Sequence, residues 1–326
     1  TSSGTEGDNH AIKGVAYAKK DKGNHIITTK VEHPAVLNTC KHLAKDGFEV
    51  TYLDVDSDGL IDLSALKAAI TSKTILLSIM YANNETGVIL PIKEIGDIAK
   101  EKGVTFHTDA VQAAGKIPID VQKLNVDLLT ISGHKLYGPK GTGALFAKRG
   151  VRLVPLIHGG HHERNRRGGT ENVAGIAGLG KAAEIAMRDM ESESALLQTL
   201  RNRIEKGMAE KIPQIKINGH IDKRLPNTAN ISFEFVEGES LLLNLDMKGI
   251  AASSGSACTS GSLEPSHVLL AMGLTHEMSH GSVRFSLGKS STAEDVEYLL
   301  TIMPPIVERM RGMSPLYAGA KGTVLR

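Results

Sequence analysis

Strand-like and helix-like segments alternate regularly through the first part of this 326-residue chain. Short apolar runs predict strands, and apolar residues at helical spacing predict helices between them. In chain order the predictions are a strand over 25–31, a helix over 35–45, a strand over 48–53, a helix over 63–70, a strand over 74–81, a helix over 91–102 and a strand over 104–109. Such alternation requires right-handed crossovers, so we expect an α/β fold with a mostly parallel sheet covered by helices on both faces.

A second domain is expected after this alternating part, because the chain is long enough for two. A long helix is predicted over 173–211. It is followed by a strand over 227–235, a helix over 240–247, a strand over 282–287 and a closing helix over 293–311 that we expect to be bent or interrupted at Pro304 and Pro305. We place the large domain at residues 1–190 and a smaller α+β domain at 191–326. The chain opens at Thr1 within a turn that feeds a helix, so we expect further residues upstream.

The composition limits which classes of protein this chain can belong to. Lys and Arg number 38 against 36 Asp and Glu, a formal charge of +2 that is too balanced to indicate a nucleic-acid or membrane surface. No apolar run in this sequence is long enough to span a bilayer, and we expect no secretory leader. Cys40 and Cys258 are the only cysteines, which excludes a disulfide framework and fits a reducing compartment. We therefore expect a soluble, cytoplasmic protein.

Polar residues collect at or just beyond the ends of the predicted strands. They are His33, Asn83, Asn84, Asp109, Gln112, Ser132, His134 and Lys135. Each of them alone is more often a turn residue or a satisfied polar group. Ligands of parallel α/β sheets bind at the carboxyl ends of the strands, however, so the clustering predicts a single site there.

Lys135 is the most informative of these residues. It follows an apolar strand over 127–131 in a tight Ser-Gly-His-Lys turn, with a Gly- and Pro-rich segment over 136–143 behind it, and the preceding strand ends in Asp109. A lysine and an acid at the ends of neighbouring strands suit pyridoxal phosphate, because the lysine forms a Schiff base and the carboxylate keeps the pyridine nitrogen protonated. The alternative is an ordinary solvated lysine.

Two further segments suggest anion contacts. Ser3, Gly4 and Thr5 lie at the start of the first predicted helix, where backbone amides and the helix dipole suit a phosphate, although plain N-capping explains them as well. The polar loop over 158–170 contains possible metal ligands, which are His158, His161, His162 and Glu163. Without a helix to fix their spacing, anion contacts or a subunit interface made by Arg164, Arg166 and Arg167 are favoured over a metal site.

Cys258 lies in a Ser- and Gly-rich segment over 252–265. Such surroundings predict an accessible thiol that can ionise and act as a nucleophile, against the alternative of an ordinary cysteine in a surface loop. Cys40 lies in a predicted helix and fits a buried structural cysteine.

Six motifs, taken together and in order along the whole chain, resemble the NifS/IscS-type cysteine desulfurases, which are pyridoxal phosphate enzymes of the class V aminotransferase family with the aspartate aminotransferase fold. The motifs are Val-Glu-His-Pro-Ala-Val (31–36), Ala-Asn-Asn-Glu-Thr-Gly-Val (82–88), Thr-Asp-Ala-Val-Gln (108–112), Ser-Gly-His-Lys with Gly-Pro-Lys-Gly (132–141), Arg-Arg-Gly-Gly-Thr-Glu-Asn-Val (166–173) and Ser-Ser-Gly-Ser-Ala-Cys (253–258). The resemblance implies conversion of L-cysteine to L-alanine, with sulfur carried as a persulfide on Cys258. It also implies a homodimer that passes sulfur to an iron–sulfur scaffold or another acceptor protein.

The same resemblance implies a role for each matching residue. Lys135 would form the Schiff base, Asp109 would bind the pyridine nitrogen and Gln112 the phenolic oxygen of the cofactor. His33 would stack on the ring and assist proton transfer. The phosphate would be held by Gly4, Thr5, Ser132 and His134, with Thr170 reaching in from the other subunit. Asn84 and Arg284 would bind the substrate carboxylate.

This chain differs from the family in two places. The family has several tens of further residues at the N-terminus, including segments that line the substrate pocket. Where relatives often have Gly-Gly-Gly-Gln-Glu, this chain has Gly159-Gly-His-His-Glu163. Three alternatives to a desulfurase are a selenocysteine lyase or cysteine-sulfinate desulfinase of the same fold, an inactive sulfur-carrier partner, and a metal-binding module built on the histidine loop.

Overall fold

The computed structural model describes residues 1–254, 264–315 and 317, which form two compact units. The first unit comprises Thr1–Val55, Leu60–Asn84 and Ile89–Glu191, and the second comprises Asp56–Gly59, Glu85–Val88 and the described part of Ser192–Arg326. Two short segments from the first half of the chain therefore belong to the second unit. Cys258 lies outside the described residues.

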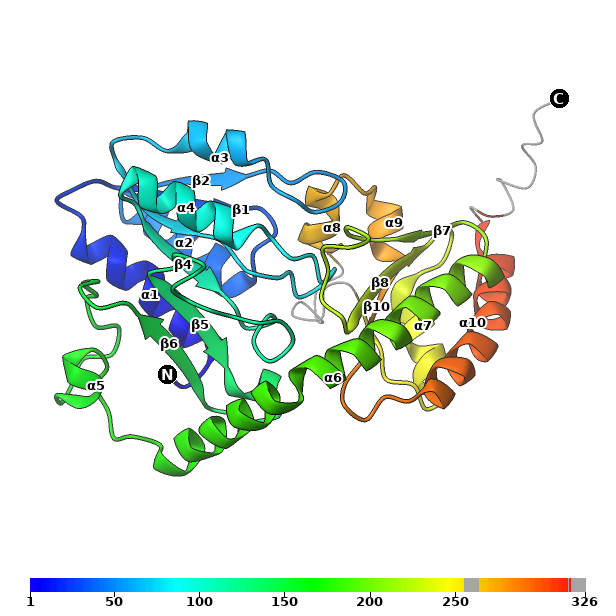
Figure 1. The fold of residues 1–326 in the computed structure, drawn as a ribbon. Helices are drawn as coiled ribbons and strands as arrows, with labels where there is room; N and C mark the ends of the chain where they lie inside the picture. The colour runs from blue at the N-terminus through cyan, green and yellow to red at the C-terminus, as the bar shows by residue number, and fades with distance from the viewer. Residues whose placement is uncertain (255–263, 316, 318–326) are drawn as a thin grey trace. The chain divides into compact units, whose positions relative to one another are not determined.

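The first unit is built on a six-stranded sheet with strand order β2-β1-β3-β4-β5-β6 (Figure 1). Its strands are β1 (His25–Thr29), β2 (Glu49–Leu53), β3 (Thr74–Ser78), β4 (Thr105–Asp109), β5 (Leu128–Ser132) and β6 (Gly143–Ala147). All neighbours pair in parallel except β5 and β6, which are antiparallel. The expected α/β fold with a mostly parallel sheet is confirmed, and the antiparallel edge strand β6 is an element that the sequence did not reveal.

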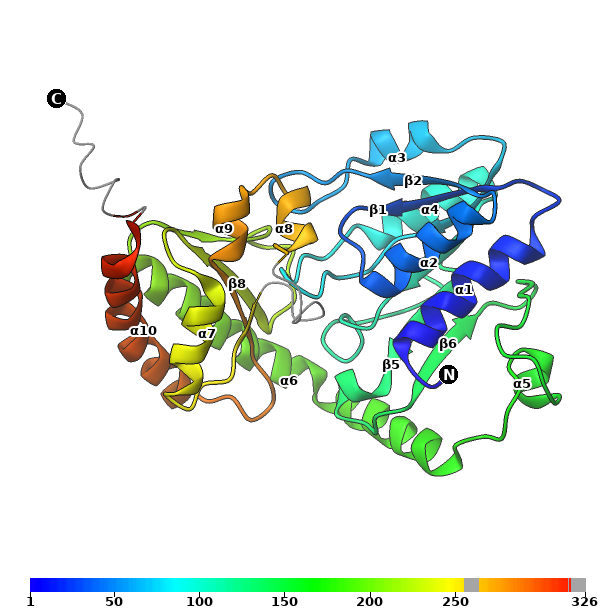
Figure 2. The same ribbon diagram turned by 180° about the vertical axis from the view of Figure 1, so that it is seen from behind.

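Helices cover both faces of this sheet. They are α1 (Gly4–Ala18), α2 (Pro34–Lys45), α3 (Leu63–Ala69) and α4 (Ile92–Lys102). Figures 1 and 2 show α1 and α2 on one face and α4 on the other. The α1 face buries a cluster that includes Ile12, Val15, Ile26, Val36 and Leu128. Fully burying one such side chain contributes about 1.5–3 kcal/mol, so this apolar layer fixes α1 over the strands.

Gly96 marks the closest approach of α4 to its neighbouring loop. A Cβ at this position would lie 2.0 Å from the carbonyl oxygen of Leu124, which is a backbone atom that cannot rotate away. We therefore expect Gly96→Ala to lower the free energy of unfolding by about 1–3 kcal/mol, as overpacking does. Gly312→Ala is the control, because nothing lies within 4 Å of a Cβ there. Chemical denaturation of both variants checks this, and equal stability of Gly96→Ala and the unmodified chain would contradict it.

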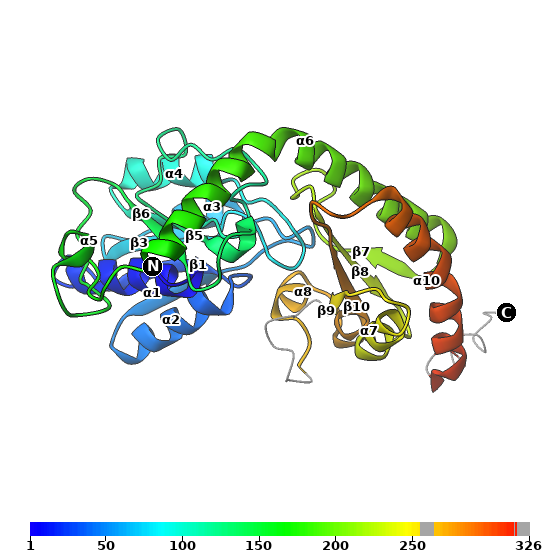
Figure 3. The same cartoon turned by 90° about the horizontal axis from the view of Figure 1, so that it is seen from below.

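The second unit contains a four-stranded sheet of order β7-β8-β10-β9 in which every pair is antiparallel. Its strands are β7 (Ile215–Ile217), β8 (Thr228–Phe233), β9 (Ser253–Ser254) and β10 (Ser282–Ser286). Its helices are α7 (Gly238–Asp246), α8 (His267–Ala271), α9 (His276–His280) and α10 (Ala293–Met313). The core lies between the sheet and α10 and includes Ile231, Phe233, Val283, Leu300 and Met303. The long helix α6 (Val173–Lys211), seen in Figure 3, contributes residues to both units.

The closing helix α10 runs without interruption through Pro304 and Pro305, so the predicted interruption there is wrong. Pro304 cannot donate to the carbonyl of Leu300, which a helix would otherwise require. Lys211 Nζ donates to that carbonyl instead, at 3.2 Å. Met303 and Ile306, on either side of the prolines, are both buried in the core and hold the helix in place.

Candidate active site

Three segments converge at the carboxyl ends of β4 and β5. These strands pair in parallel, with Asp109 opposite Thr130, so the residues that follow them lie side by side. Helix α1 begins at Gly4 against the same edge. A Cβ on Gly4 would lie 2.8 Å from Cγ2 of Val111 and 3.4 Å from Cβ of Ser132. The structure therefore brings together Gly4, Asp109 and Ser132, as predicted from the sequence, and only glycine fits where the helix approaches the strands.

The start of α1 presents groups that suit a phosphate. The first-turn amides of a helix have no intrahelical acceptor, and the helix dipole favours an anion there. Ser3 caps the helix, with Oγ accepting from the amide of Glu6 at 3.1 Å, and Thr5 is exposed on the first turn. Across from it, Ser132 Oγ lies 2.9 Å from Nδ1 of His134. Amides, hydroxyls and an imidazole are thus available to one anion.

Asp109 and Lys135 form the charged centre of this edge. Oδ1 of Asp109 accepts from the amide of Val111 at 2.8 Å. Burial raises the pKa of Asp109 to about 6, while the Val111 amide and the positive charge of Lys135 act to lower it. Lys135 belongs to the 3-10 turn Gly133–Leu136 directly after β5. The predicted acid and lysine therefore influence each other electrostatically. A buried carboxylate can bind the protonated pyridine nitrogen of pyridoxal phosphate, and a nearby amine can form a Schiff base with its aldehyde. Asp109 and Lys135 therefore fit this cofactor.

A buried polar network lies beneath Asp109, and sequence reasoning missed it. His107 bonds Ser78 Oγ at 2.9 Å and Thr130 Oγ1 at 3.0 Å, and its Nε2 is 3.7 Å from Oδ1 of Asp8. Burial lowers the pKa of His107 to about 3, so the ring is neutral. Burial, and then the charge of Asp109, raise the pKa of Asp8. The available signal was the two-residue period of β4, which places His107 and Asp109 on the same face.

His33 begins α2 and has a defined tautomer. Its Nδ1 accepts from the amide of Ala35 at 3.1 Å, which caps the helix. Because Nδ1 is the acceptor in this bond, the neutral ring carries its proton on Nε2. While Nδ1 caps α2, the neutral ring of His33 can donate a hydrogen bond only through Nε2.

Neighbouring contacts order the segment around His33 and Asn84. Glu32 is fully buried, and its Oε1 accepts from Thr29 Oγ1 at 2.8 Å and from the amide of Met80 at 3.0 Å. Burial raises the pKa of Glu32 to about 8. Nδ2 of Asn83 donates to the carbonyl of Val31 at 2.9 Å, which ties the segment after β3 to the segment after β1. The strand-end segments that carry His33 and Asn84 are therefore held next to each other.

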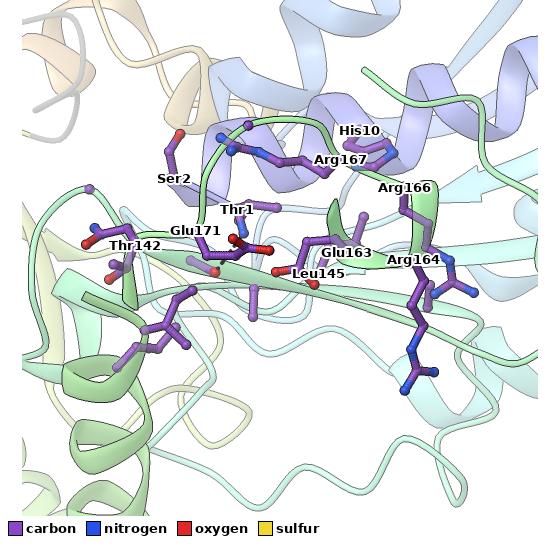
Figure 4. A pocket seen from close by; sticks show the side chains of 18 of the residues that line it. Thr1, Ser2, His10, Thr142, Leu145, Glu163, Arg164, Arg166, Arg167 and Glu171 are labelled. Atoms are coloured by element: carbon purple, nitrogen blue, oxygen red, sulfur yellow. Dashed lines mark hydrogen bonds between the residues drawn. The ribbon is translucent and has the colours of Figure 1, made fainter. Parts of the chain in front are cut away.

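Thr170 lines a cavity of about 610 Å³ in the first unit. Figure 4 shows this cavity. Arg164 and Arg166 gather at one end of this cavity and Thr142 lies toward the other. The neighbouring Arg167 donates from Nε to Glu6 Oε1 at 2.9 Å, and this ion pair joins the loop to the first turn of α1. The loop that carries Thr170 is therefore anchored to the first turn of α1 through this partly buried ion pair.

The loop that contains His158, His161 and His162 was considered above as a possible metal site. In the part of the chain that the structure describes, no group of three or more His, Cys, Asp or Glu side chains is placed to hold a metal ion. His162 begins the short helix α5 (His162–Asn165), and Glu163 and Arg164 within it have positive φ angles.

Arg284 lies on β10 of the second unit, opposite Asn230 of β8 and Ser253 of β9. Cys258 falls outside the described residues, so its predicted role has no structural account. Cys40 is buried in α2, where burial raises the pKa of its thiol to about 12 and makes it a poor nucleophile. None of the described helices has the length and apolar character needed to cross a membrane.

Comparison with known proteins gives consistent results. A model of the family described as aminotransferase class V matches residues 1–299. The cysteine desulfurase IscS of Clostridium botulinum (strain Hall) is 57% identical over 319 residues, which is 97% of this chain and 80% of the relative. A solved NifS-like protein has a TM-score of 0.87 and 39% identity, covering 95% of this chain and 81% of that one. A structure of SspA in complex with cysteine has a TM-score of 0.76 and 40% identity, covering 88% and 80%.

Proposed function

Because this chain belongs to the class V aminotransferase family and has cysteine desulfurase function, we propose that it converts L-cysteine to L-alanine and keeps the sulfur as a persulfide on Cys258. The observation that carries the proposal is that Asp109 and the positive charge of Lys135 influence each other beside the start of α1, at the carboxyl edge of the parallel strands. This arrangement supports a pyridoxal phosphate enzyme, and the similarity to cysteine desulfurases supports the sulfurtransferase type.

The residues that would hold pyridoxal phosphate all belong to the first unit. The first-turn amides at Gly4, together with Thr5, Ser132 and His134, would bind the phosphate, and Asp109 and Gln112 would bind the ring nitrogen and the phenolic oxygen. When bound, the cofactor supplies an electron sink for charge that develops on the substrate α-carbon. Asp109 would be held for this contact by the amide of Val111, and His107, bonded to Ser78 and Thr130, would supply a neutral layer on the same face of β4.

Two residues would take part in the proton transfers. Lys135 would hold the cofactor at rest and, once displaced by substrate, its Nζ would take and return the α-proton. His33 would assist these transfers through a hydrogen bond from Nε2, because Nδ1 accepts from the amide of Ala35. Asn84 and Arg284 would bind the substrate carboxylate, for which the planar guanidinium fork is well matched.

The sulfur step needs a second thiol. The Cys258 thiolate would attack the sulfur of bound L-cysteine, so the sulfur–carbon bond breaks as the sulfur–sulfur bond forms. The electron pair of the broken bond remains on the substrate carbon, which is protonated, and alanine leaves. A reducing, cytoplasmic setting would keep this thiol available between turnovers.

The sulfur chemistry also indicates which partner proteins this chain needs. The persulfide must be passed to an iron–sulfur scaffold protein or another sulfur acceptor. We propose a homodimer in which Thr170 contributes to the phosphate site of the other subunit, because the resemblance to cysteine desulfurases implies this role and Thr170 is exposed in its own subunit.

The reaction is tested by incubating the protein, loaded with pyridoxal phosphate, with L-cysteine and a thiol reductant. Alanine and sulfide should appear in equal amounts and continue over many turnovers. Alanine without sulfide, or neither product, would contradict the proposal. An inactive sulfur-carrier partner would yield neither.

His33→Asn is expected to separate proton transfer from folding. Asparagine is a good N-cap, so α2 should be retained and the melting temperature should change little. The proton of Nε2 is lost, so the rate of alanine formation should fall by about 10²-fold. Steady-state kinetics beside thermal denaturation checks both parts. Retained activity in His33→Asn would rule out the proton-transfer role.

A further inference from the structure

Glu85 is a buried carboxyl of the second unit that has no part in the roles derived above. It directly follows Asn84, and its side chain is 3% exposed. Burial raises its pKa to about 7, while the Ser266 hydroxyl and the positive charge of Arg284 act to lower it. Because the pKa lies above the ordinary value for glutamate, ionisation near neutral pH costs folding stability. Its presence therefore calls for a reason other than stability.

Two contacts fix the position of Glu85. Its Oε2 accepts from the hydroxyl of Ser266, and Ser266 Oγ in turn accepts from the amide of Leu269 at 3.1 Å as the N-cap of α8. The backbone carbonyl of Glu85 accepts from Nδ2 of Asn230 at 3.1 Å. Ser266 is 2% exposed and Asn230 is fully buried. Both the side chain and the backbone of Glu85 are therefore held by groups that cannot readily move.

The strand pairing places Arg284 beside this carboxyl. Arg284 on β10 is directly opposite Asn230 on β8, and directly opposed residues project from the same face of a sheet. The side chain of Asn230 reaches Glu85, and the charge of Arg284 acts on Glu85. Arg284, Asn230 and Glu85 therefore share one face of the second sheet, and all of them lie within the second unit.

We propose that Glu85 is a positioning residue whose carboxylate, held by Ser266 while Asn230 holds its backbone carbonyl, orients the guanidinium of Arg284 to bind the α-carboxylate of the substrate. This rests on the proposed function, in which Arg284 binds that carboxylate. A guanidinium has five N–H donors in a planar fork. If Glu85 accepts from one edge of the Arg284 guanidinium, the remaining N–H groups are left to bind the substrate carboxylate. The orientation then exists before the substrate arrives, and less ordering is needed on binding.

The test uses the protein loaded with pyridoxal phosphate and compares Glu85→Gln with Glu308→Gln. Glutamine keeps an oxygen for Ser266 but loses the charge that faces Arg284, whereas Glu308 is exposed on α10. For Glu85→Gln, KM for L-cysteine should rise roughly tenfold, as for loss of one hydrogen bond to a charged group, with kcat within about twofold. Glu308→Gln should match the unmodified protein.

Two further measurements separate positioning from a merely structural role. Cysteamine has the amine and thiol of cysteine but no carboxylate, so its dissociation constant, followed by the visible absorbance of the cofactor, should be unchanged in Glu85→Gln. The melting temperature of Glu85→Gln at pH 8 should not fall, because a buried charge has been removed. Ser266→Ala, which releases the carboxylate but keeps its charge, should raise KM by a smaller factor.

An unchanged KM for L-cysteine in Glu85→Gln would overturn the positioning role, and so would an equal weakening of L-cysteine and cysteamine. These outcomes leave the proposed function intact, because the unmodified protein still forms alanine and sulfide. If instead the unmodified protein forms neither product, the proposed function itself is wrong and the assignment of Arg284 is lost with it.

Discussion

Replacing Lys135 with alanine is expected to abolish alanine formation, with a loss of at least about 10⁴-fold, because the variant lacks both the amine that holds the cofactor and the group that moves the α-proton. The effect should be local. Lys135 lies in the 3-10 turn after β5 and its side chain is exposed, so its removal leaves no cavity in the core. The fold should be retained, and circular dichroism should match the unmodified protein.

Covalent trapping of the cofactor tests directly whether Lys135 is the lysine that holds it. After borohydride reduction of the loaded protein, mass spectrometry should find the cofactor attached to the peptide that contains Lys135, and to no lysine in the Lys135→Ala variant. Lys123→Ala is the matched control, because Lys123 is an exposed lysine of the same unit. Attachment that persists in Lys135→Ala, or that is lost in Lys123→Ala, would mean that another lysine is responsible.

Replacing Cys258 with serine should remove sulfur transfer while leaving the cofactor site intact. The expected loss in sulfide formation is at least about 10³-fold, because a hydroxyl at neutral pH is a far weaker nucleophile than a thiolate. The visible absorbance of the loaded protein should be unchanged, since every residue that would bind the cofactor belongs to the first unit. Sulfide assays check the loss of sulfur transfer, and absorbance spectra of the same sample check that the cofactor site is intact.

Cys40→Ala is the control for this experiment. Cys40 is buried in α2, so its replacement is expected to lower the melting temperature but to retain sulfide formation. Selenocysteine provides a further comparison. If Cys258→Ser still released selenium from L-selenocysteine but no sulfur from L-cysteine, a broader lyase of the same fold would be favoured. If Cys258→Ser kept full sulfide formation, the persulfide role of Cys258 would be ruled out.

The alternation of apolar runs predicted the strands of the first sheet well, because buried parallel strands are nearly continuous in hydrophobicity. The antiparallel strand β6 (Gly143–Ala147) was missed, since only its first residue is buried and its pattern is weak. The uninterrupted helix α10 could not be foreseen, because the donor that replaces the missing amide comes from Lys211, about ninety residues away in the chain.

In the candidate site too, some residues could be predicted from the sequence and others could not. Asp109 and Lys135 were predictable because Asp109 ends β4 and Lys135 lies in the turn directly after β5, and the position of a strand end can be inferred from sequence. His107 and Asp8 were missed because their contact, 3.7 Å between Nε2 and Oδ1, depends on how α1 packs across the sheet. Glu85 was missed for a similar reason. Its neighbours Ser266 and Arg284 are close to it only once the short segment Glu85–Val88 has joined the second unit.

A single-turnover experiment tests the central claim most directly. The loaded protein is mixed with one equivalent of L-cysteine without reductant, and both the alanine released and the mass of the Cys258 peptide are measured. We expect about one alanine per site and the addition of one sulfur atom to that peptide. Alanine formation with an unmodified Cys258 peptide, or a modified peptide without alanine, would contradict the account.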